Sequence, residues 1–230
     1  MTAPVSVVIP TLEAADRIGP CIERLVPGLA AGLIRELIIA DGGSSDGIEA
    51  VADAVGARLV VAPRGRGQQL GAGCNAARGA WLLVLHADTL LPEGWEHTVA
   101  AHLSGHADRA GYFGLGFDDG GMGARWVGAW ANLRSALFAL PYGDQGLLLP
   151  VALYRAAGGY PPIPLMEDVA LVRRIGRRGL RRLPGQVMTS AARYRRGGWM
   201  GRGARNLATL ALWFLGASPE RLARFYRGQG

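Results

Sequence analysis

The stretch GRGQQLGAGCNAARGAWLLVLHADTLLP, residues 65–92, joins a segment of small residues to an apolar run that ends in a histidine and an aspartate. Gln68–Arg78 is expected to be helical, and the apolar run Trp81–Leu85 predicts a strand. A continuous apolar run is typical of a strand that is covered on both faces in a parallel sheet. His86 and Asp88 therefore fall at the strand end, where such sheets bind ligands.

Three similar units precede this stretch, and each begins with a short apolar run. The expected strands are Val5–Ile9, Leu37–Ala40 and Leu59–Val61; the expected helices are Glu13–Val26, ended by Pro27 and Gly28, and Asp46–Val55. This alternation predicts an α/β fold with a mostly parallel central sheet, right-handed crossovers and flanking helices.

The second half of the chain is less regular. Its expected elements are strands at Tyr112–Phe117 and Gly146–Leu149 and helices at Gly123–Leu140, Glu167–Arg177 and Trp199–Leu215. No internal repeat or low-complexity linker interrupts it. We predict a single domain over residues 1–230, with a nucleotide-binding half (1–92), an acceptor half (93–198) and a helical tail (199–230) that covers the sheet edge.

The 230 residues carry a net charge of +7, and every basic side chain other than histidine is arginine. Arginine usage can reflect genome composition, but guanidinium groups also favour phosphate and carboxylate. The cysteines, Cys21 and Cys74, are far apart, which indicates a reducing cytoplasm. The N-terminus has no basic signal region, and the longest apolar run, Leu207–Ala217, is shorter than the roughly 20 residues of a membrane span. We expect a cytoplasmic protein with at most peripheral contact with the inner face of the membrane.

Acidic residues also follow the second expected strand, in the sequence Asp41-Gly-Gly-Ser-Ser-Asp46-Gly. A carboxylate at Asp41 can accept a hydrogen bond from a base or a ribose, or it can merely cap the next helix. For Asp46, which opens the helical segment, the cap is the favoured interpretation.

His86 and Asp88 are two residues apart, so their side chains can point to the same side and hold one divalent cation together with substrate phosphates. An alternative is a dinucleotide fingerprint, because residues 71–76 read GAGCNA. Such a fingerprint begins directly after a strand, whereas several residues separate Val61 from Gly71. The small residues are better explained by close packing of a helix on the sheet.

The adjacent acids Glu167 and Asp168 follow a proline-rich loop and open a helix. The helix dipole alone favours acids there. A carboxylate held at such a point can also serve as a general base.

Together these segments resemble the family 2 glycosyltransferases of the GT-A (nucleotide-diphosphosugar transferase) fold. The matching stretches are SVVIPTLE (6–13), ELIIADGGSSDG (36–47), residues 65–92 quoted above, GDQGLLLP (143–150) and PLMEDVALVRRI (164–175). The sequence is most similar to short bacterial transferases associated with radical-SAM and selenodomain proteins and with arsenosugar biosynthesis. Their tail also resembles TSAARY (189–194) and LGASPERLARFY (215–226).

The resemblance implies a UDP- or GDP-sugar donor, Mn²⁺ or Mg²⁺, and an acceptor that is a small molecule or lipid-linked; no nucleic acid is expected as a partner. The implied donor-binding residues are Pro10, Thr11, Glu13, Asp41, Arg66, Gln69 and Asp88. Asp88 matches the last acid of the DxD metal motif, and His86 replaces its first acid. Where the family has Asn-Glu, this chain has Glu13-Ala14, which alters one expected ribose contact.

By the same resemblance Asp168 is the catalytic base of an inverting transfer, and Gly143, Asp144, Gln145 and Glu167 position donor and acceptor sugars. The signature of processive synthases is missing, since residues 191–194 only echo its end, which favours a single transfer.

Two alternatives stay open at this point. A sugar-phosphate nucleotidyltransferase shares the architecture, but it needs a glycine-rich basic loop after the first strand, where Thr11-Leu12-Glu13 stands. A noncatalytic binder of nucleic acid or membrane surfaces accounts for the arginines but leaves the acids at the strand ends unexplained.

The tail helix places Leu207, Leu210, Ala211, Phe214 and Leu215 on one face. Burial of this face on the sheet is the favoured interpretation, and contact with an anionic membrane is the alternative.

Overall fold

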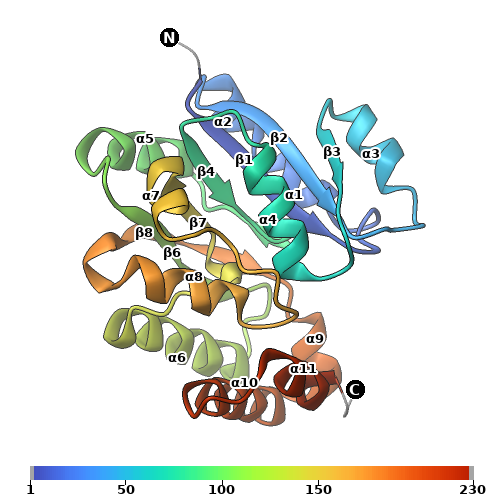
Figure 1. Ribbon diagram of the computed structural model, residues 1–230, viewed down its shortest axis with the longest axis vertical. Coiled ribbons are helices and arrows are strands. Elements are labelled where there is room, and N and C mark those ends of the chain that lie inside the picture. Colours follow the sequence, from blue (N-terminus) through green and yellow to red (C-terminus); the bar gives the residue numbers. More distant parts are fainter. Residues whose placement is uncertain (1–2, 228–230) are drawn as a thin grey trace.

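An eight-stranded sheet runs through the molecule in our computed structural model, which describes residues 3–227 except for the side chains at 193, 196, 197 and 227 (Figure 1). The strands lie in the order β3-β2-β1-β4-β7-β6-β8-β5. Their bounds are β1 Val5–Thr11, β2 Ile34–Asp41, β3 Arg58–Val61, β4 Trp81–Val84, β5 Thr89–Leu90, β6 Ala110–Phe117, β7 Leu147–Pro150 and β8 Leu180–Thr189.

The first four strands pair in parallel, as the apolar runs predict. In the register, Val7 of β1 lies between Leu37 of β2 and Leu83 of β4. Strands β1 and β4 are apolar without alternation because they lie in the middle of the sheet, where both faces are covered.

The second half of the sheet is mixed. Strand β7 is antiparallel to both β4 and β6, whereas β6 and β8 are parallel. Strands β6 and β7 fall where strands were expected, whereas β8 was not expected; together they continue the sheet, so the C-terminal part of the chain does more than cover its edge. Strand β8 is hard to find in the sequence because it contains Pro184 and Gly185, which fit a bulge. The register shifts there, from Tyr112 opposite Arg182 to Gly114 opposite Gln186.

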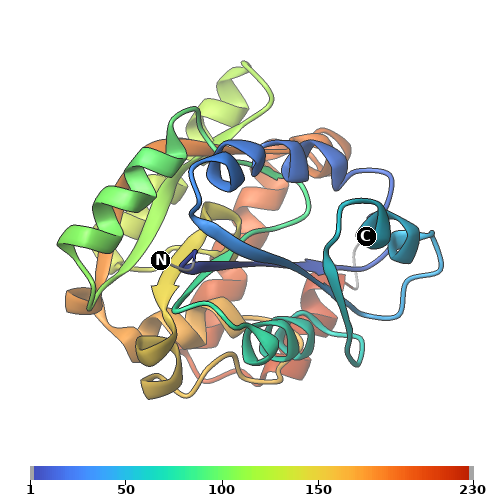
Figure 2. The ribbon, with the colours of Figure 1, turned by 90° about the horizontal axis from the view of Figure 1, so that it is seen from above.

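Helices cover both faces of the sheet (Figure 2). One apolar cluster contains residues of α1 (Gly19–Glu23), α3 (Ile48–Ala54), α5 (Trp95–Gly105) and α6 (Met122–Phe138). The other contains residues of α4 (Arg66–Ala76), α7 (Val151–Ala156) and α8 (Glu167–Ile175). Alternate residues of β1 divide between them: Val7 and Ile9 belong to the first and Val8 to the second.

The expected helix over Glu13–Val26 is wrong. Glu13 has a positive φ of 49°, which begins a turn, and two short helices follow: α1 and α2 (Val26–Ala30). Each carries a proline in its first turn, Pro20 and Pro27. Proline fits the first turn of a helix because the N–H it lacks has no intrahelical partner there. Pro27 therefore begins a helix that we expected it to end.

The small residues of α4 pack this helix closely on the sheet, as the sequence indicates. A Cβ atom at Gly73 would lie 2.7 Å from Val8 Cγ1 and 2.9 Å from Ala40 Cβ. Glycine is required here by the approach of helix and sheet, which supports the packing interpretation over the dinucleotide fingerprint.

Three helices end the described chain: α9 (Ala192–Gly197), α10 (Trp199–Phe214) and α11 (Pro219–Arg227). Helix α10 packs against α6, α9 and α11. The sequence predicted that one apolar face of α10 would be buried, and this prediction is wrong for most of that face. Leu210 is buried, but Leu207, Phe214 and Leu215 remain 49%, 47% and 83% exposed, because α10 lies beside α6 rather than flat on the sheet.

Within residues 3–227, none of the helices combines the length and the apolar character that crossing a bilayer requires.

Candidate functional site

Two adjoining cavities open at the carboxyl ends of β1 and β4. The larger cavity, about 510 Å³, lies beside Pro10 and Thr11 and the beginning of α4. The smaller cavity, about 160 Å³, lies between α8 and the C-terminal helices. Arg66, His86 and Asp88 line both cavities, so the HxD sequence after β4 stands where they meet.

The larger cavity has the chemistry of an anion site. Helix α4 begins at Arg66 without a side-chain cap, and Gly65 and Arg66 at its start line the cavity, where the positive end of the helix favours an anion. Arg17 and Arg64 add positive charge to the lining. Arg64 belongs to the glycine- and arginine-rich loop that follows the third expected strand, whereas no pattern in the sequence pointed to Arg17. Gln69 lines the cavity too, and its amide donates hydrogen bonds to the carbonyl oxygens of Thr11 and Ala40, which ties α4 to the ends of β1 and β2.

The carboxylate of Asp41 accepts hydrogen bonds from its own turn and from the end of β1. It accepts from the Thr11 hydroxyl (2.9 Å), the Gly43 amide (2.8 Å), and the amide and hydroxyl of Ser44 (2.7 and 2.6 Å). Burial alone would raise its pKa, but these hydrogen bonds outweigh it and hold the pKa below the usual value. The carboxylate is therefore absent from the cavity lining, and a contact with the base stays a prediction.

Glu13 also points away from the cavity. Its Oε1 accepts from the Ser45 amide at 3.0 Å, so it joins the loops after β1 and β2 rather than lining the larger cavity. Asp46 links the same loops: one oxygen accepts from the Ala15 amide at 2.7 Å, and the other accepts from the Ile48 amide at 3.3 Å. The predicted cap is wrong, because α3 begins at Ile48 and Gly47 is its N-cap residue.

His86 and Asp88 stand in a setting that fits a divalent cation. Asp144 lines the smaller cavity with them, and its Oδ1 is buried without a hydrogen-bond partner. Burial raises the pKa of Asp144 to about 6; Arg134 opposes this shift, and Asp168 and Asp88 add to it. A cation would relieve this crowding of carboxylates.

The protein alone does not complete a metal shell. Among the residues that the structure describes, no three His, Cys, Asp or Glu side chains gather as a metal site. A cation held by one or two of these carboxylates would therefore need substrate phosphates or water to complete its shell.

The two acids that open α8 differ in their surroundings. Glu167 is 1% exposed, and its Oε1 lies 2.6 Å from Arg66 Nε. Burial raises the pKa of Glu167 and the positive charge of Arg66 opposes that shift. Asp168 lines the smaller cavity, where its Oδ2 accepts from the Gly143 amide at 2.8 Å and lies 3.8 Å from Arg66 Nη2.

The turn before β7 holds this arrangement together. Gly143 has no room for a side chain, because a Cβ there would lie 2.8 Å from His86 Nε2. Gln145 is fully buried; its Oε1 accepts from the Ser135 hydroxyl at 2.7 Å, and its Nε2 donates to the Phe113 carbonyl at 3.0 Å. Gln145 therefore shapes the turn, and its predicted sugar contact could only be indirect.

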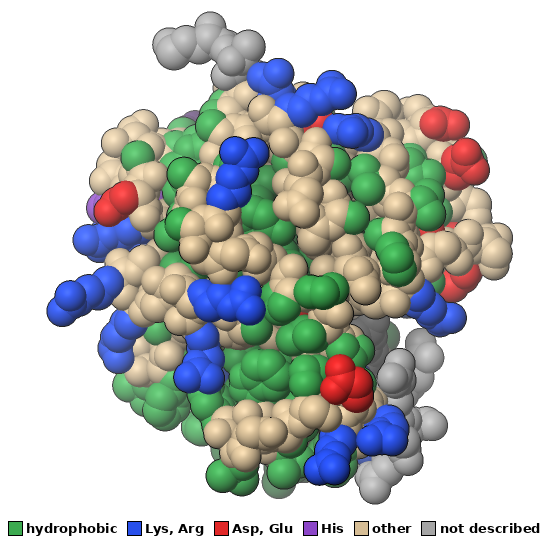
Figure 3. Space-filling model, in the orientation of Figure 1, with side chains coloured by type: hydrophobic (Ala, Val, Ile, Leu, Met, Phe, Trp, Pro, Cys, Tyr) green, Lys and Arg blue, Asp and Glu red, His purple; other side chains and the backbone are tan. Residues whose placement is uncertain are grey.

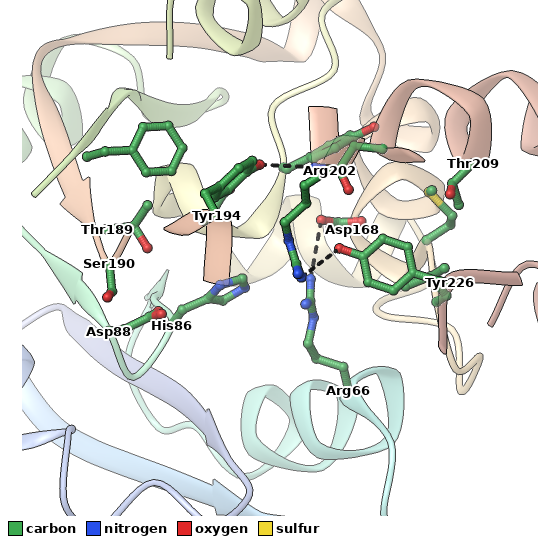
Figure 4. A pocket seen from close by; sticks show the side chains of 16 residues that line it. Arg66, His86, Asp88, Asp168, Thr189, Ser190, Tyr194, Arg202, Thr209 and Tyr226 are labelled. Carbon is green, nitrogen blue, oxygen red and sulfur yellow. Dashed lines mark hydrogen bonds and ion pairs between the residues drawn. The ribbon is translucent and has the colours of Figure 1, made fainter. Parts of the chain in front are cut away.

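A further wall comes from the C-terminal helices, and the sequence analysis assigned it no role. Tyr194, Arg202 and Tyr226 line the smaller cavity from α9, α10 and α11. Arg202 Nη2 lies 3.4 Å from the Tyr226 hydroxyl. In Figure 4 the side chains of Arg66 and Arg202 reach into the cavity from opposite sides. In the sequence, the one indication that this part of the chain contributes to the site was the resemblance of residues 189–194 and 215–226 to the tail of similar transferases.

Known proteins resemble this chain in both sequence and fold. The sequence profile of glycosyl transferase family 2 matches residues 6–138, more than half of the chain. Similar curated proteins are the glucosyl-3-phosphoglycerate synthases of Mycolicibacterium paratuberculosis, 36% identical over 97 residues, and Mycolicibacterium smegmatis, 35% identical over 98 residues. These matches cover 38% and 39% of this chain, but only 29% and 32% of the relatives' length.

Solved structures share the fold. Glucosyl-3-phosphoglycerate synthase from Mycobacterium tuberculosis with Mn²⁺ and UDP-glucose superposes with a TM-score of 0.55 at 23% identity, covering 82% of this chain and 70% of that one. The structure of residues 1–349 of TarS from S. aureus superposes with a TM-score of 0.63 at 13% identity, covering 97% of this chain and 70% of that one. The expected GT-A fold is confirmed.

Proposed function

The chain belongs to glycosyl transferase family 2, and we propose that it transfers one sugar from a UDP-sugar to an acceptor bound in the smaller cavity, with inversion at the anomeric carbon. That it is a glycosyltransferase follows from the family. The donor, the acceptor and the residue roles are the proposal. The observation that carries it is the meeting of the two cavities at Arg66, His86 and Asp88, with Asp168 on the wall of the smaller one.

UDP-glucose is the donor that we propose first. The M. tuberculosis synthase binds Mn²⁺ with UDP or UDP-glucose. In this chain the nucleotide would occupy the larger cavity, beside Pro10, Thr11 and Gln69, with its diphosphate toward the N-terminus of α4. A GDP-sugar is the alternative, and a panel of donors distinguishes the two.

Asp88, with His86 beside it, would hold the divalent cation. When bound, the cation would offset the charge that develops on the diphosphate leaving group. Arg66 stands at the same junction and adds a fixed positive charge, because Glu167 orients its guanidinium.

Asp168 is the proposed base. Its carboxylate would take the proton of the acceptor hydroxyl while that oxygen bonds to the anomeric carbon and the bond from that carbon to the diphosphate breaks. The Gly143 amide and Arg66 fix the position of this carboxylate, as a general base requires.

The acceptor is proposed only by class. The M. tuberculosis synthase binds phosphoglyceric acid, and Arg66 and Arg202 in the smaller cavity would suit an anionic acceptor of that kind. A lipid-linked acceptor stays an alternative, as does a substrate within arsenosugar biosynthesis.

The test is binding and slow hydrolysis of UDP-glucose, GDP-glucose and related donors with and without Mn²⁺. We expect Mn²⁺-dependent binding of a UDP-sugar and release of UDP, with Asp88→Ala inactive and the exposed control Asp53→Ala unchanged. Metal-independent binding, or no binding of any nucleotide sugar by the folded protein, would overturn the proposal.

A further inference from the structure

The outer side of α6 is an exposed apolar stripe. Met122, Trp126, Trp130, Leu133 and Leu137 follow each other at intervals of three or four residues, so they lie on one side of the helix. They are 86%, 69%, 39%, 48% and 52% exposed. The opposite side of α6 carries Ala124, Ala131 and Ser135, which pack on the sheet. Within the described chain, no other element covers the outer side of this stripe, so a large part of each side chain faces solvent.

Helix α10 extends this surface. It packs beside α6, with Gly203 close to Val127, and presents Met200, Leu207, Phe214 and Leu215 to solvent. We call these four residues and the five of the stripe the α6–α10 face. Figure 3 shows hydrophobic side chains gathered at the lower end of the molecule, where Figure 1 places α6 and α10.

The charges around the α6–α10 face are predominantly positive. Residues 122–138 and 192–216 contain arginines and no acidic residue. Arg173 lies over the ring of Phe214, 4.9 Å from its centroid. Arg177 donates hydrogen bonds to the carbonyls of Leu137 and Ala136, at the C-terminal end of α6. The exposed Arg125 lies one residue before Trp126.

The nearby acids do not balance this charge. Asp118 and Asp119, just before α6, lie 3.8 and 3.5 Å from Arg195 Nη1. The other acids close in sequence to these helices are Glu220 of α11 and Asp144, which lines the smaller cavity. A partner of this face should therefore be both apolar and anionic.

We propose that the α6–α10 face docks on a membrane surface that contains anionic lipid. Tryptophan and phenylalanine are favoured at the level of the lipid headgroups, and arginines at the border of an apolar face bind lipid phosphate. A second copy of the chain fits less well. A two-fold axis through this face would bring arginines against arginines without carboxylates to pair them.

The placement also bears on the cavity. Helix α10 presents Met200 and Leu207 to solvent, and it also presents Arg202 and Asn206 to the smaller cavity. Docking would thus hold that cavity near the headgroups. The inference does not rest on the proposed function, since docking can be measured without any substrate.

The test is co-sedimentation of the full chain with phosphatidylcholine vesicles that contain or lack phosphatidylglycerol. We expect binding to the anionic vesicles, a blue shift of tryptophan fluorescence, and weakening by salt because the arginine–phosphate contacts are screened. Trp126→Ser/Trp130→Ser should weaken binding on the order of tenfold or more. Arg125→Gln should weaken it about fivefold.

The matched control is Leu29→Ser/Val61→Ser, which alters exposed apolar residues of α2 and β3 and should leave binding unchanged. Trp130 is only 39% exposed, so the tryptophan variant should melt somewhat lower than the original chain, and binding is compared at a temperature at which melting curves show every variant folded. Equal binding by the tryptophan variant would overturn the proposal. So would a concentration-dependent dimer that the tryptophan substitutions dissolve, because the face would then be a subunit interface.

Discussion

The Nε atom of Arg66 lies 2.6 Å from Oε1 of Glu167, a residue 101 positions further along the chain. This ion pair joins the beginning of α4 to the beginning of α8, and so joins the two cavities. It also separates the roles of the adjacent acids. Glu167 is buried and anchors Arg66, whereas Asp168 is left to face the smaller cavity.

The ion pair predicts a moderate loss of stability in Glu167→Gln. Removing one partner of a fully buried pair costs about 3–5 kcal/mol. Arg66 keeps 38% of its side chain exposed, so water compensates part of this loss and we expect about 1–2 kcal/mol. Urea denaturation measures it, with the exposed Glu49→Gln as control. The KM for the donor should rise as well, since Arg66 is less firmly oriented; unchanged stability and KM would mean that the pair does not organise the site.

Asp168→Asn should separate chemistry from binding. The amide keeps nearly the same shape and can still accept from the Gly143 amide, but it cannot take a proton at neutral pH. We expect turnover to fall by ~10²-fold or more, with donor affinity retained within a few-fold. Single-turnover rates and calorimetric titration with UDP in Mn²⁺ provide the two measurements. Turnover within a few-fold of the original chain would exclude base catalysis by Asp168.

Asp88→Ala should abolish the effect of Mn²⁺ on donor binding while the protein stays folded. Asp88 lines both cavities, so its loss removes a carboxylate from the point where the diphosphate is expected. His86→Ala should have a smaller effect, because imidazole is a weaker ligand for these hard cations than carboxylate. Titration of each variant with UDP, with and without Mn²⁺, makes the comparison. If Asp88→Ala binds UDP in Mn²⁺ as tightly as before, Asp88 is not a ligand.

The parallel half of the fold could be predicted because a strand that is buried on both faces appears in the sequence as a continuous apolar run. Strands β1 and β4 are apolar at nearly every position, and their ends carry the polar residues of the site. Strand β8 has no continuous apolar run. Its exposed Arg181 and Arg182 and its Pro184-Gly185 bulge break both the apolar run and the alternation.

The same reasoning explains what was predictable in the site. The acids after β4 and at the start of α8 follow local rules for strand ends and helix starts. The wall formed by Tyr194, Arg202 and Tyr226 depends on how three helices pack, which no local pattern determines. The hydrogen bonds that occupy Asp41 and Gln145 depend likewise on distant partners such as Thr11 and Phe113.

The depressed pKa of Asp41 predicts a loss of stability in acid. Its folded-state pKa lies below the ordinary value of 3.8, so the unfolded chain binds the proton more readily. The stabilisation is therefore complete above that ordinary value and is lost as the pH falls toward the folded-state pKa. Asp41→Asn should cost about 1–3 kcal/mol at neutral pH, because its amide group cannot accept from all four donors.

Urea denaturation at neutral pH and near pH 3 checks this dependence. The difference between Asp41→Asn and the original chain should shrink at the lower pH, while the exposed Asp53→Asn should behave like the original at both. A difference that is constant with pH would mean that the carboxylate charge of Asp41 does not stabilise the loop.

Two glycines on one helix provide the sharpest test of the packing of α4. In a helix, alanine is favoured over glycine by about 0.5–1 kcal/mol, so helix propensity alone would make each Gly→Ala variant more stable than the original chain. At Gly71 the new Cβ would meet only the Tyr160 carbonyl oxygen, at an ordinary 3.6 Å, and the gain should survive as higher stability. At Gly73 it would lie 2.7 Å from Val8 Cγ1 and 2.9 Å from Ala40 Cβ. Both atoms belong to central strands that cannot easily move.

Overpacking of this kind costs about 1–3 kcal/mol, which exceeds the helical gain. Gly73→Ala should therefore be less stable than the original chain, although the two substitutions are chemically identical and lie two residues apart. Urea denaturation of both variants decides the matter, because only the sign of each change is needed. Equal gains at both positions would show that α4 stands further from the sheet, and the glycines would then need another explanation, such as the close approach of a ligand.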